Sequence, residues 1–209
     1  MTETAQEPID FTMMYVTHNA LRRDLSRFAT AVAANRAATP GVRAGWQNFK
    51  SQLHVHHTVE DDDLWPRLYR AVTDPSQDHA MLKAMEAEHA VLDPMLDRVD
   101  ATLANGDQAS LSTDVEALSA ALDGHLQHEE ASALPLVQTV LTVADWRAFG
   151  AAMRRRQGLS GTAVYVPWIV DGATPADRNR FFSVLPTPVQ MINRVFWEPR
   201  YRRLGLWSA

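Results

Sequence analysis

The sequence contains no cysteine, and this absence removes several classes of protein. Without thiols the chain cannot form disulfides, zinc–thiolate sites or cysteine-ligated iron–sulfur clusters. It also lacks an apolar run of the about 20 residues that a bilayer-spanning helix needs. The stretch from Met1 to Asp10 is polar and acidic, without the apolar core of a signal peptide. We therefore expect a cytoplasmic protein with no membrane span.

Positive charge is scarce over most of the chain. The net charge is −5, yet residues 145–209 hold ten arginines against four acidic residues, which leaves the first 144 residues strongly acidic. An acidic body disfavours nucleic acid as a partner, and no nucleic-acid-binding motif is present. The basic tail could contact the body, a second copy of the chain or an anionic surface. Composition does not choose among these partners.

Apolar residues recur every three or four positions through most of the first 140 residues, a spacing typical of amphipathic helices. Pro66 should kink or loosen the last turns of the second helix, and the fourth helix should bend at Pro135, because proline lacks an N–H and clashes with the preceding turn. Short loops between long helices favour antiparallel neighbours. The predicted fold class is all-α, an up-down four-helix bundle with helices over about 11–37, 42–72, 77–104 and from 110 past Pro135.

The pattern changes beyond residue 143. Residues 145–157 are predicted to form a fifth helix, 164–170 form an apolar run interrupted by proline, and 189–203 are rich in Trp, Phe and Arg. Such a tail is too apolar to be disordered. We therefore predict a bundle domain over residues 11–143 and a helical C-terminal extension over residues 144–209. The extension should pack on the bundle or on a second subunit, in which case the protein is a homodimer.

A His-x-x-x-Glu pattern occurs twice in the predicted bundle. His56 and Glu60 are repeated 69 residues later as His125 and Glu129. Positions i and i+4 lie on the same face of a helix, so each pair can aim an imidazole and a carboxylate at one point. Supplied twice, this combination builds a two-metal carboxylate site inside a helical bundle.

A weaker repeat adds a histidine on each of the other two helices. Met14 and His18 recur 71 residues later as Met85 and His89. A lone histidine on an apolar face is more often a core residue than a ligand, but burying so many ionisable groups without compensation would be costly. A metal pair removes that difficulty. The predicted metal ligands are four histidines and two bridging glutamates: His18, His56, Glu60, His89, His125 and Glu129.

Neighbouring residues leave alternatives open. Asp61 and Glu130 lie at i+5 from the two histidines and are rival bridging ligands, although helical geometry favours i+4. His57 lies one residue off the ligand stripe and is expected to be a hydrogen-bonding or surface group. Further residues are expected near a bound small molecule: Met14 and Met85 as a dry wall beside the metals, and Tyr15 and Glu86 as an extra ligand or a hydrogen-bonding group.

Residues 11–140 resemble a hemerythrin-like, or HHE cation-binding, domain. The resemblance rests on the lone histidines, on Glu88 before His89, and on the two His-x-x-x-Glu-acid stretches, each followed by a Leu and a Pro. It implies an up-down bundle around a non-heme diiron centre with an oxo or hydroxo bridge, which binds O2 and related ligands; manganese is an alternative metal. The tail resembles an extension found in some actinobacterial members.

One departure from the family pattern affects the expected function. Oxygen-carrying members have a fifth histidine one turn before the third-helix histidine, where this chain has Met85. Open coordination suits reaction with O2, peroxide or nitric oxide in sensing, storage or protection. The alternatives are an O2-activating oxidase or oxygenase with the extension as a lid, and metals that only stabilise the fold. A pocket joining the metals to the tail, lined by Trp168 or Trp197, would favour the enzyme.

Overall fold

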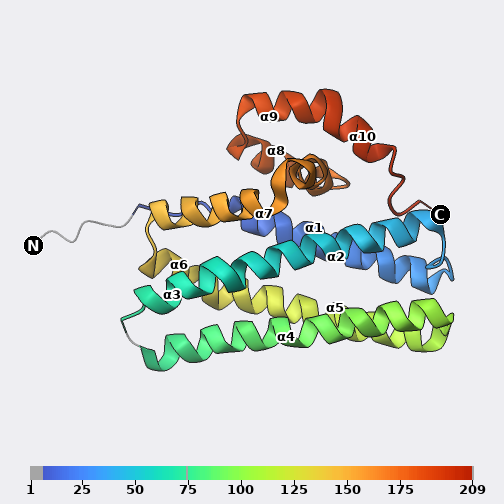
Figure 1. The fold of residues 1–209 in the computed structure, drawn as a ribbon, viewed down its shortest axis with the longest axis horizontal. Coiled ribbons are helices and arrows are strands. Elements are labelled where there is room, and N and C mark those ends of the chain that lie inside the picture. Colours follow the sequence, from blue (N-terminus) through green and yellow to red (C-terminus); the bar gives the residue numbers. More distant parts are fainter. Residues whose placement is uncertain (1–6, 74, 209) are drawn as a thin grey trace, which may run out of the picture.

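A computed structural model describes residues 7–73 and 75–208, and their regular elements are all helical (Figure 1). Within these residues, four helical arms lie side by side as an up-down bundle, which confirms the predicted all-α class. The first arm packs against the second and the fourth, and the third packs against the fourth. In chain order the arms are α1 (Thr12–Ala33); α2 (Pro40–Val59), η1 (Glu60–Leu64) and α3 (Trp65–Ala71); α4 (Pro75–Asn105); and α5 (Gln108–His128), η2 (Glu129–Ala133) and α6 (Leu134–Val140).

The second and fourth arms each contain a π-helical turn, η1 and η2. The irregularity expected at Pro66 and Pro135 thus takes the form of a π-helical turn just before each proline. In both arms the residue before the proline donates its N–H to the carbonyl five residues back, Trp65 to Glu60 and Leu134 to Glu129. A wider turn relieves the clash of the proline ring with the preceding turn. The helix then continues as α3 or α6.

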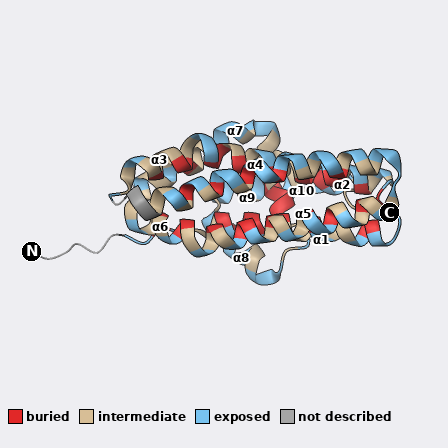
Figure 2. Cartoon of the chain, turned by 90° about the horizontal axis from the view of Figure 1, so that it is seen from below, coloured by how far each residue is buried: buried red, intermediate tan, exposed pale blue. Residues whose placement is uncertain are grey.

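The apolar core is divided into two clusters by a layer of buried histidine and glutamate. One cluster surrounds Phe28 and Trp46, and the other surrounds Trp65 and Met85, all fully buried. Buried residues follow the inward faces of the arms (red in Figure 2), as the apolar stripes predict. The polar layer therefore lies within the bundle, with apolar side chains toward both ends.

The extension crosses one face of the bundle above α1 and α2 (Figure 1). The predicted fifth helix does not stop at Gln157: the chain turns at Gly158, whose φ of 63° is accessible to glycine, and continues as a helix to Val170. The apolar run at 164–170 is thus helical, and its last five residues are buried. The elements of the extension are α7 (Val143–Val170), α8 (Pro175–Val184), α9 (Thr187–Ile192), η3 (Asn193–Trp197) and α10 (Glu198–Arg202).

Polar contacts and close packing fix the extension on the bundle. The Trp168 indole N–H donates to the buried Asp24 carboxylate at 2.7 Å. At the far end, the Trp207 backbone N–H donates to the Gly41 carbonyl at 2.8 Å, and the Trp207 ring lies so close to Gly45 that a Cβ there would overlap it. The extension is therefore held at its middle and near its end.

Candidate metal centre

Each arm of the bundle contributes one buried imidazole to the polar layer. His18 comes from α1, His56 from α2, His89 from α4 and His125 from α5, and none is more than 5% exposed. The rings meet in two pairs through their Nε2 atoms, at 3.1 Å between His18 and His56 and 3.1 Å between His89 and His125. The fold thus brings together the four histidines that the repeats single out.

Glu60 and Glu129 begin the two π-helical turns and are fully buried between the imidazole pairs. One Glu60 oxygen lies 3.3 Å from His56 Nε2, and the other lies 3.7 Å from His89 Nε2. A Glu129 oxygen lies 3.1 Å from His18 Nε2. The Glu60 carboxylate therefore spans the two pairs. We call the six residues His18, His56, Glu60, His89, His125 and Glu129 the buried centre.

The donor set fits a pair of divalent metal ions. Among the described residues, none of the four carboxylate oxygens of Glu60 and Glu129 has a hydrogen-bond partner. Two unpartnered buried carboxylates would be strongly unfavourable without a positive charge between them. Ligand atoms of His18, His56, Glu60 and Glu129 all lie within 4.8 Å of one another, as a bound cation requires. Imidazole and carboxylate donors suit iron, manganese or zinc.

A second layer of carboxylates orients three of the imidazoles from outside. Glu130 lies 2.8 Å from His18 Nδ1, Asp61 lies 2.7 Å from His89 Nδ1, and Glu88 lies 2.9 Å from His125 Nδ1. An Nδ1–H that donates to such a carboxylate leaves the Nε2 lone pair free to bind metal. Asp61 and Glu130, the rival i+5 acids, thus contact the outer ring nitrogens, while Glu60 and Glu129 face inward.

Electrostatics in the centre depend strongly on burial. Burial alone would lower the pKa of His18, but the carboxylates of Glu129 and Glu130 raise it above its ordinary value. Burial, then the nearby imidazoles, lowers the pKa of His56. Burial and the neighbouring Glu129 raise the pKa of Glu60. Burial would also raise the pKa of Glu129, but His18, His56 and His125 together lower it to about 2. His56 is thus a neutral donor, and Glu60 is the group that a cation would stabilise most.

His57 lies beside the buried centre, although the sequence predicts it to be a hydrogen-bonding or surface group. It is only 7% exposed, and its ring stacks on His89 with centroids 3.9 Å apart. Ligand atoms of His57, His89 and His125 lie within 4.8 Å of one another. The missed signal is the repeat itself: the equivalent residue, Leu126, is apolar, which marks the position as facing the core.

The residues expected beside a small ligand divide into two groups. Met14 and Met85 are buried in the apolar cluster next to the centre. Tyr15 and Glu86 lie at the surface instead, and Glu86 accepts a hydrogen bond from the Tyr69 hydroxyl at 3.3 Å. The structure does not bring Tyr15 or Glu86 into the buried centre, because both project from the outer faces of their helices.

A four-helix bundle with inward imidazoles and carboxylates defines a class of metal-binding helical proteins. Comparison with known families agrees: the hemerythrin HHE cation-binding domain matches residues 10–137. The chain belongs to the hemerythrin HHE cation-binding family. No curated protein and no solved structure gave a significant match. The division at residue 143 and the actinobacterial character of the extension stay predictions.

Within the described part of the chain, no helix combines the length and apolarity needed to cross a bilayer. The cytoplasmic location stays a prediction from the sequence.

Proposed function

We propose that the buried centre holds two iron ions and that the protein binds or reacts with O2, peroxide or nitric oxide, in sensing, storage or protection. The observation that carries the proposal is the pair of unpartnered buried carboxylates between two imidazole pairs. When bound, an iron pair supplies the electrons and open coordination positions that such oxidants require. The chain's own residues orient the ligands and, through Met14 and Met85, keep part of the surroundings dry.

The experiment is metal analysis of the purified protein, followed by optical spectra as O2, peroxide or nitric oxide is added to the anaerobic ferrous form. We expect two irons per chain and rapid spectral change with at least one oxidant. A His89→Ala variant should lose at least one iron. Zinc alone, or a His89→Ala variant with unchanged iron, would contradict the proposal. Two manganese ions per chain would support the two-metal site but contradict its assignment to iron.

We also propose that His57 makes the metal pair asymmetric, as a third imidazole beside His89 and His125. Its contact with His89 and its unpartnered Nε2 support this role. Replacing His57 with Leu, the residue at the equivalent position of the second repeat, should lower occupancy of one metal position and keep the other. Metal analysis with Mössbauer spectroscopy of the iron-loaded protein distinguishes the two positions. Two fully occupied positions with unchanged parameters would exclude His57 as a ligand.

A second candidate function is an O2-activating oxidase or oxygenase acting on a small organic molecule, and one observation favours it. A pocket reaches from His56 to the extension, although Trp168 and Trp197 are not among the described residues that line it. Product analysis after incubation of the ferrous protein with O2 and candidate substrates tests it. Substrate-independent consumption of O2 or peroxide would favour the first candidate.

A further inference from the structure

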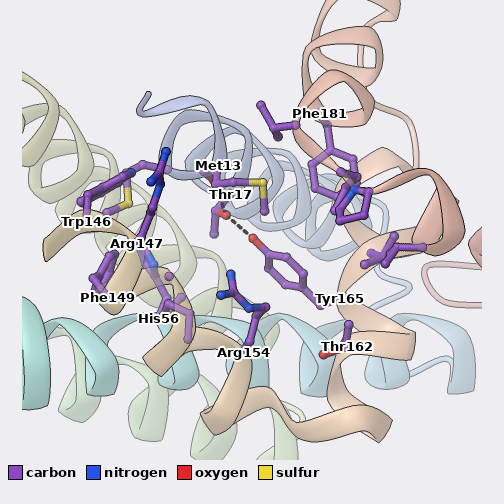
Figure 3. Close-up of a pocket in the computed structure, with 18 residues that line it drawn as sticks. Met13, Thr17, His56, Trp146, Arg147, Phe149, Arg154, Thr162, Tyr165 and Phe181 are labelled. Atoms are coloured by element: carbon purple, nitrogen blue, oxygen red, sulfur yellow. Dashed lines mark hydrogen bonds between the residues drawn. The ribbon is translucent and has the colours of Figure 1, made fainter. Parts of the chain in front are cut away.

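A pocket of about 430 Å³ lies between the bundle and the extension, beside the buried centre (Figure 3). Its walls come from α1 on the bundle side and from α7, α8 and the start of α9 on the other. This volume lies in the range of about 300–1,000 Å³ that small-molecule sites occupy. The extension thus encloses a space of ligand size that the bundle alone would not form.

Most of the pocket wall is apolar. Met13 and Met14 line it from α1, Phe149 and Met153 from α7, and Phe181 from α8. Methionine side chains adapt to varied apolar shapes, and aromatic rings provide broad contact surfaces. The main body of an occupant should therefore be hydrocarbon.

Two arginines give this apolar pocket a positive charge. Arg147 and Arg154, about two turns apart on the part of α7 that precedes Gly158, both line it (Figure 3). No acidic residue belongs to the described lining, and neither arginine forms an ion pair with any described residue. The Arg154 guanidinium lies over Gly150, with its Nη1 3.5 Å from where a Cβ would be. Unpaired guanidinium groups beside an apolar wall match a carboxylate on a hydrocarbon chain.

The inner end of the pocket meets the buried centre at His56. His56 is also the only one of the four imidazoles whose Nδ1 lacks a carboxylate partner among the described residues. The outer carboxylate layer is therefore interrupted on the pocket side. An occupant of the pocket would lie directly against that imidazole.

We propose that the pocket binds a medium-chain alkyl monocarboxylate, with its chain between α1 and the extension and its carboxylate held by Arg147 and Arg154. The site is separate from the metal ligands except at His56, so binding does not require iron. The oxidase or oxygenase candidate would use this same pocket. Carboxylate binding does not depend on that activity, so the proposal stands even if the protein oxidises no organic substrate.

The test is isothermal titration calorimetry of the full chain, as purified and after metal removal, with decanoate, decanol and decyltrimethylammonium. We expect decanoate to bind both forms and to bind at least about tenfold more tightly than the other two, as loss of a charge-assisted contact implies. In the iron-loaded protein, decanoate should also shift the visible spectrum, because it lies against His56. Absence of decanoate binding, or equal binding of all three probes, overturns the proposal. A protein that contains no iron as purified and takes up none on reconstitution, yet binds decanoate, overturns only the diiron function.

Two matched pairs of variants locate the site. Gly150→Leu adds a side chain to the pocket wall where the only near atom is the Arg154 guanidinium, and it should weaken decanoate binding at least about tenfold. Gly124→Leu, on an open surface of α5, should leave binding unchanged. Arg147→Gln with Arg154→Gln should remove the preference for decanoate over decanol, whereas Arg155→Gln with Arg156→Gln should keep it. Equal effects within either pair would overturn the assignment of the pocket.

Discussion

At the scale of single residues, Glu60 has opposite effects on metal binding and on the stability of the fold. Its carboxylate spans the imidazole pairs, yet burial and the nearby Glu129 raise its pKa well above the ordinary value. The group is therefore unfavourable in the metal-free fold and favourable once a cation lies beside it.

Replacing Glu60 with Gln should reduce bound metal from a pair to one ion or none, because the amide is a weak ligand that cannot neutralise a cation. The metal-free variant should unfold at the same or a higher temperature than the metal-free parent, since it buries no charge. Metal analysis and calorimetry measure the two effects. The control is Asp62→Asn, at an exposed residue nearby, which should change neither the metal content nor the unfolding temperature. A parent chain that unfolds on metal removal would favour metals as fold stabilisers.

The raised pKa of His18 predicts how metal affinity depends on pH. A histidine whose pKa is raised in the folded state contributes stability that is present below its unfolded pKa and lost as pH rises through its folded pKa. In the metal-free protein, His18 therefore stabilises the fold most at mildly acidic pH. Metal binding needs the neutral ring, so metal affinity should fall as pH decreases through the same range. Chelator competition at about pH 6 and about pH 8 measures this, and stronger binding at the lower pH would contradict it.

At the scale of elements, a proline repeatedly follows a π-helical turn. In the described chain, η1, η2 and η3 are each followed by a helix whose second residue is proline: Pro66, Pro135 and Pro199. In the first two, the turn begins at a carboxylate of the buried centre. The turn that accommodates the proline is thus the same turn that presents the ligand.

The docking of α7 on α1 depends on a buried hydrogen bond. Replacing Trp168 with Phe should lower the free energy of unfolding by about 1–3 kcal/mol, because it leaves an Asp24 oxygen without its 2.7 Å donor. Denaturant unfolding measures the change. Trp146→Phe loses an exposed hydrogen bond to a backbone carbonyl and should have a smaller effect. An equal effect of both would show that ring volume, rather than the buried bond, is decisive.

The sequence predicts the long elements and the ligand geometry better than the local irregularities. The repeats are sufficient to place His18, His56, His89 and His125 on inward faces, because helical periodicity is regular over many turns. The turn at Gly158 and the side on which the helix widens at Pro66 depend on packing against other elements. The burial of His57 is indicated by the apolar residue at the equivalent position of the repeat, but its stacking on His89 depends on where α4 packs.

At the scale of the whole molecule, the outer surface of the extension exposes several large apolar side chains. Met191, Val195 and Phe196 are 63%, 58% and 66% exposed on α9 and η3. Adjacent exposed apolar residues of this kind mark association sites. They favour a homodimer through the extension, one of the two alternatives that the sequence leaves open, which stays a prediction.

Replacing Phe196 with Glu should shift the protein toward the monomer, because a charge at the centre of an apolar interface is costly to bury. Sedimentation velocity over a range of concentrations measures the equilibrium. Leu159→Glu, at a residue that is 91% exposed near the turn of α7, is the control. A parent chain that is monomeric at all concentrations would exclude this role of the surface.

The contact of the chain end with α2 explains why α2 contains two glycines. Gly41 and Gly45 lie one turn apart on α2, and a side chain at either would overlap Ser208 or Trp207. Glycine in a helix interior, where Gly45 lies, is otherwise unfavourable by about 1 kcal/mol relative to alanine. A bundle that never carried this extension would have no physical reason to keep both glycines. The two glycines are therefore explained by the space they leave for the end of this chain, and alanine at either position should loosen that contact.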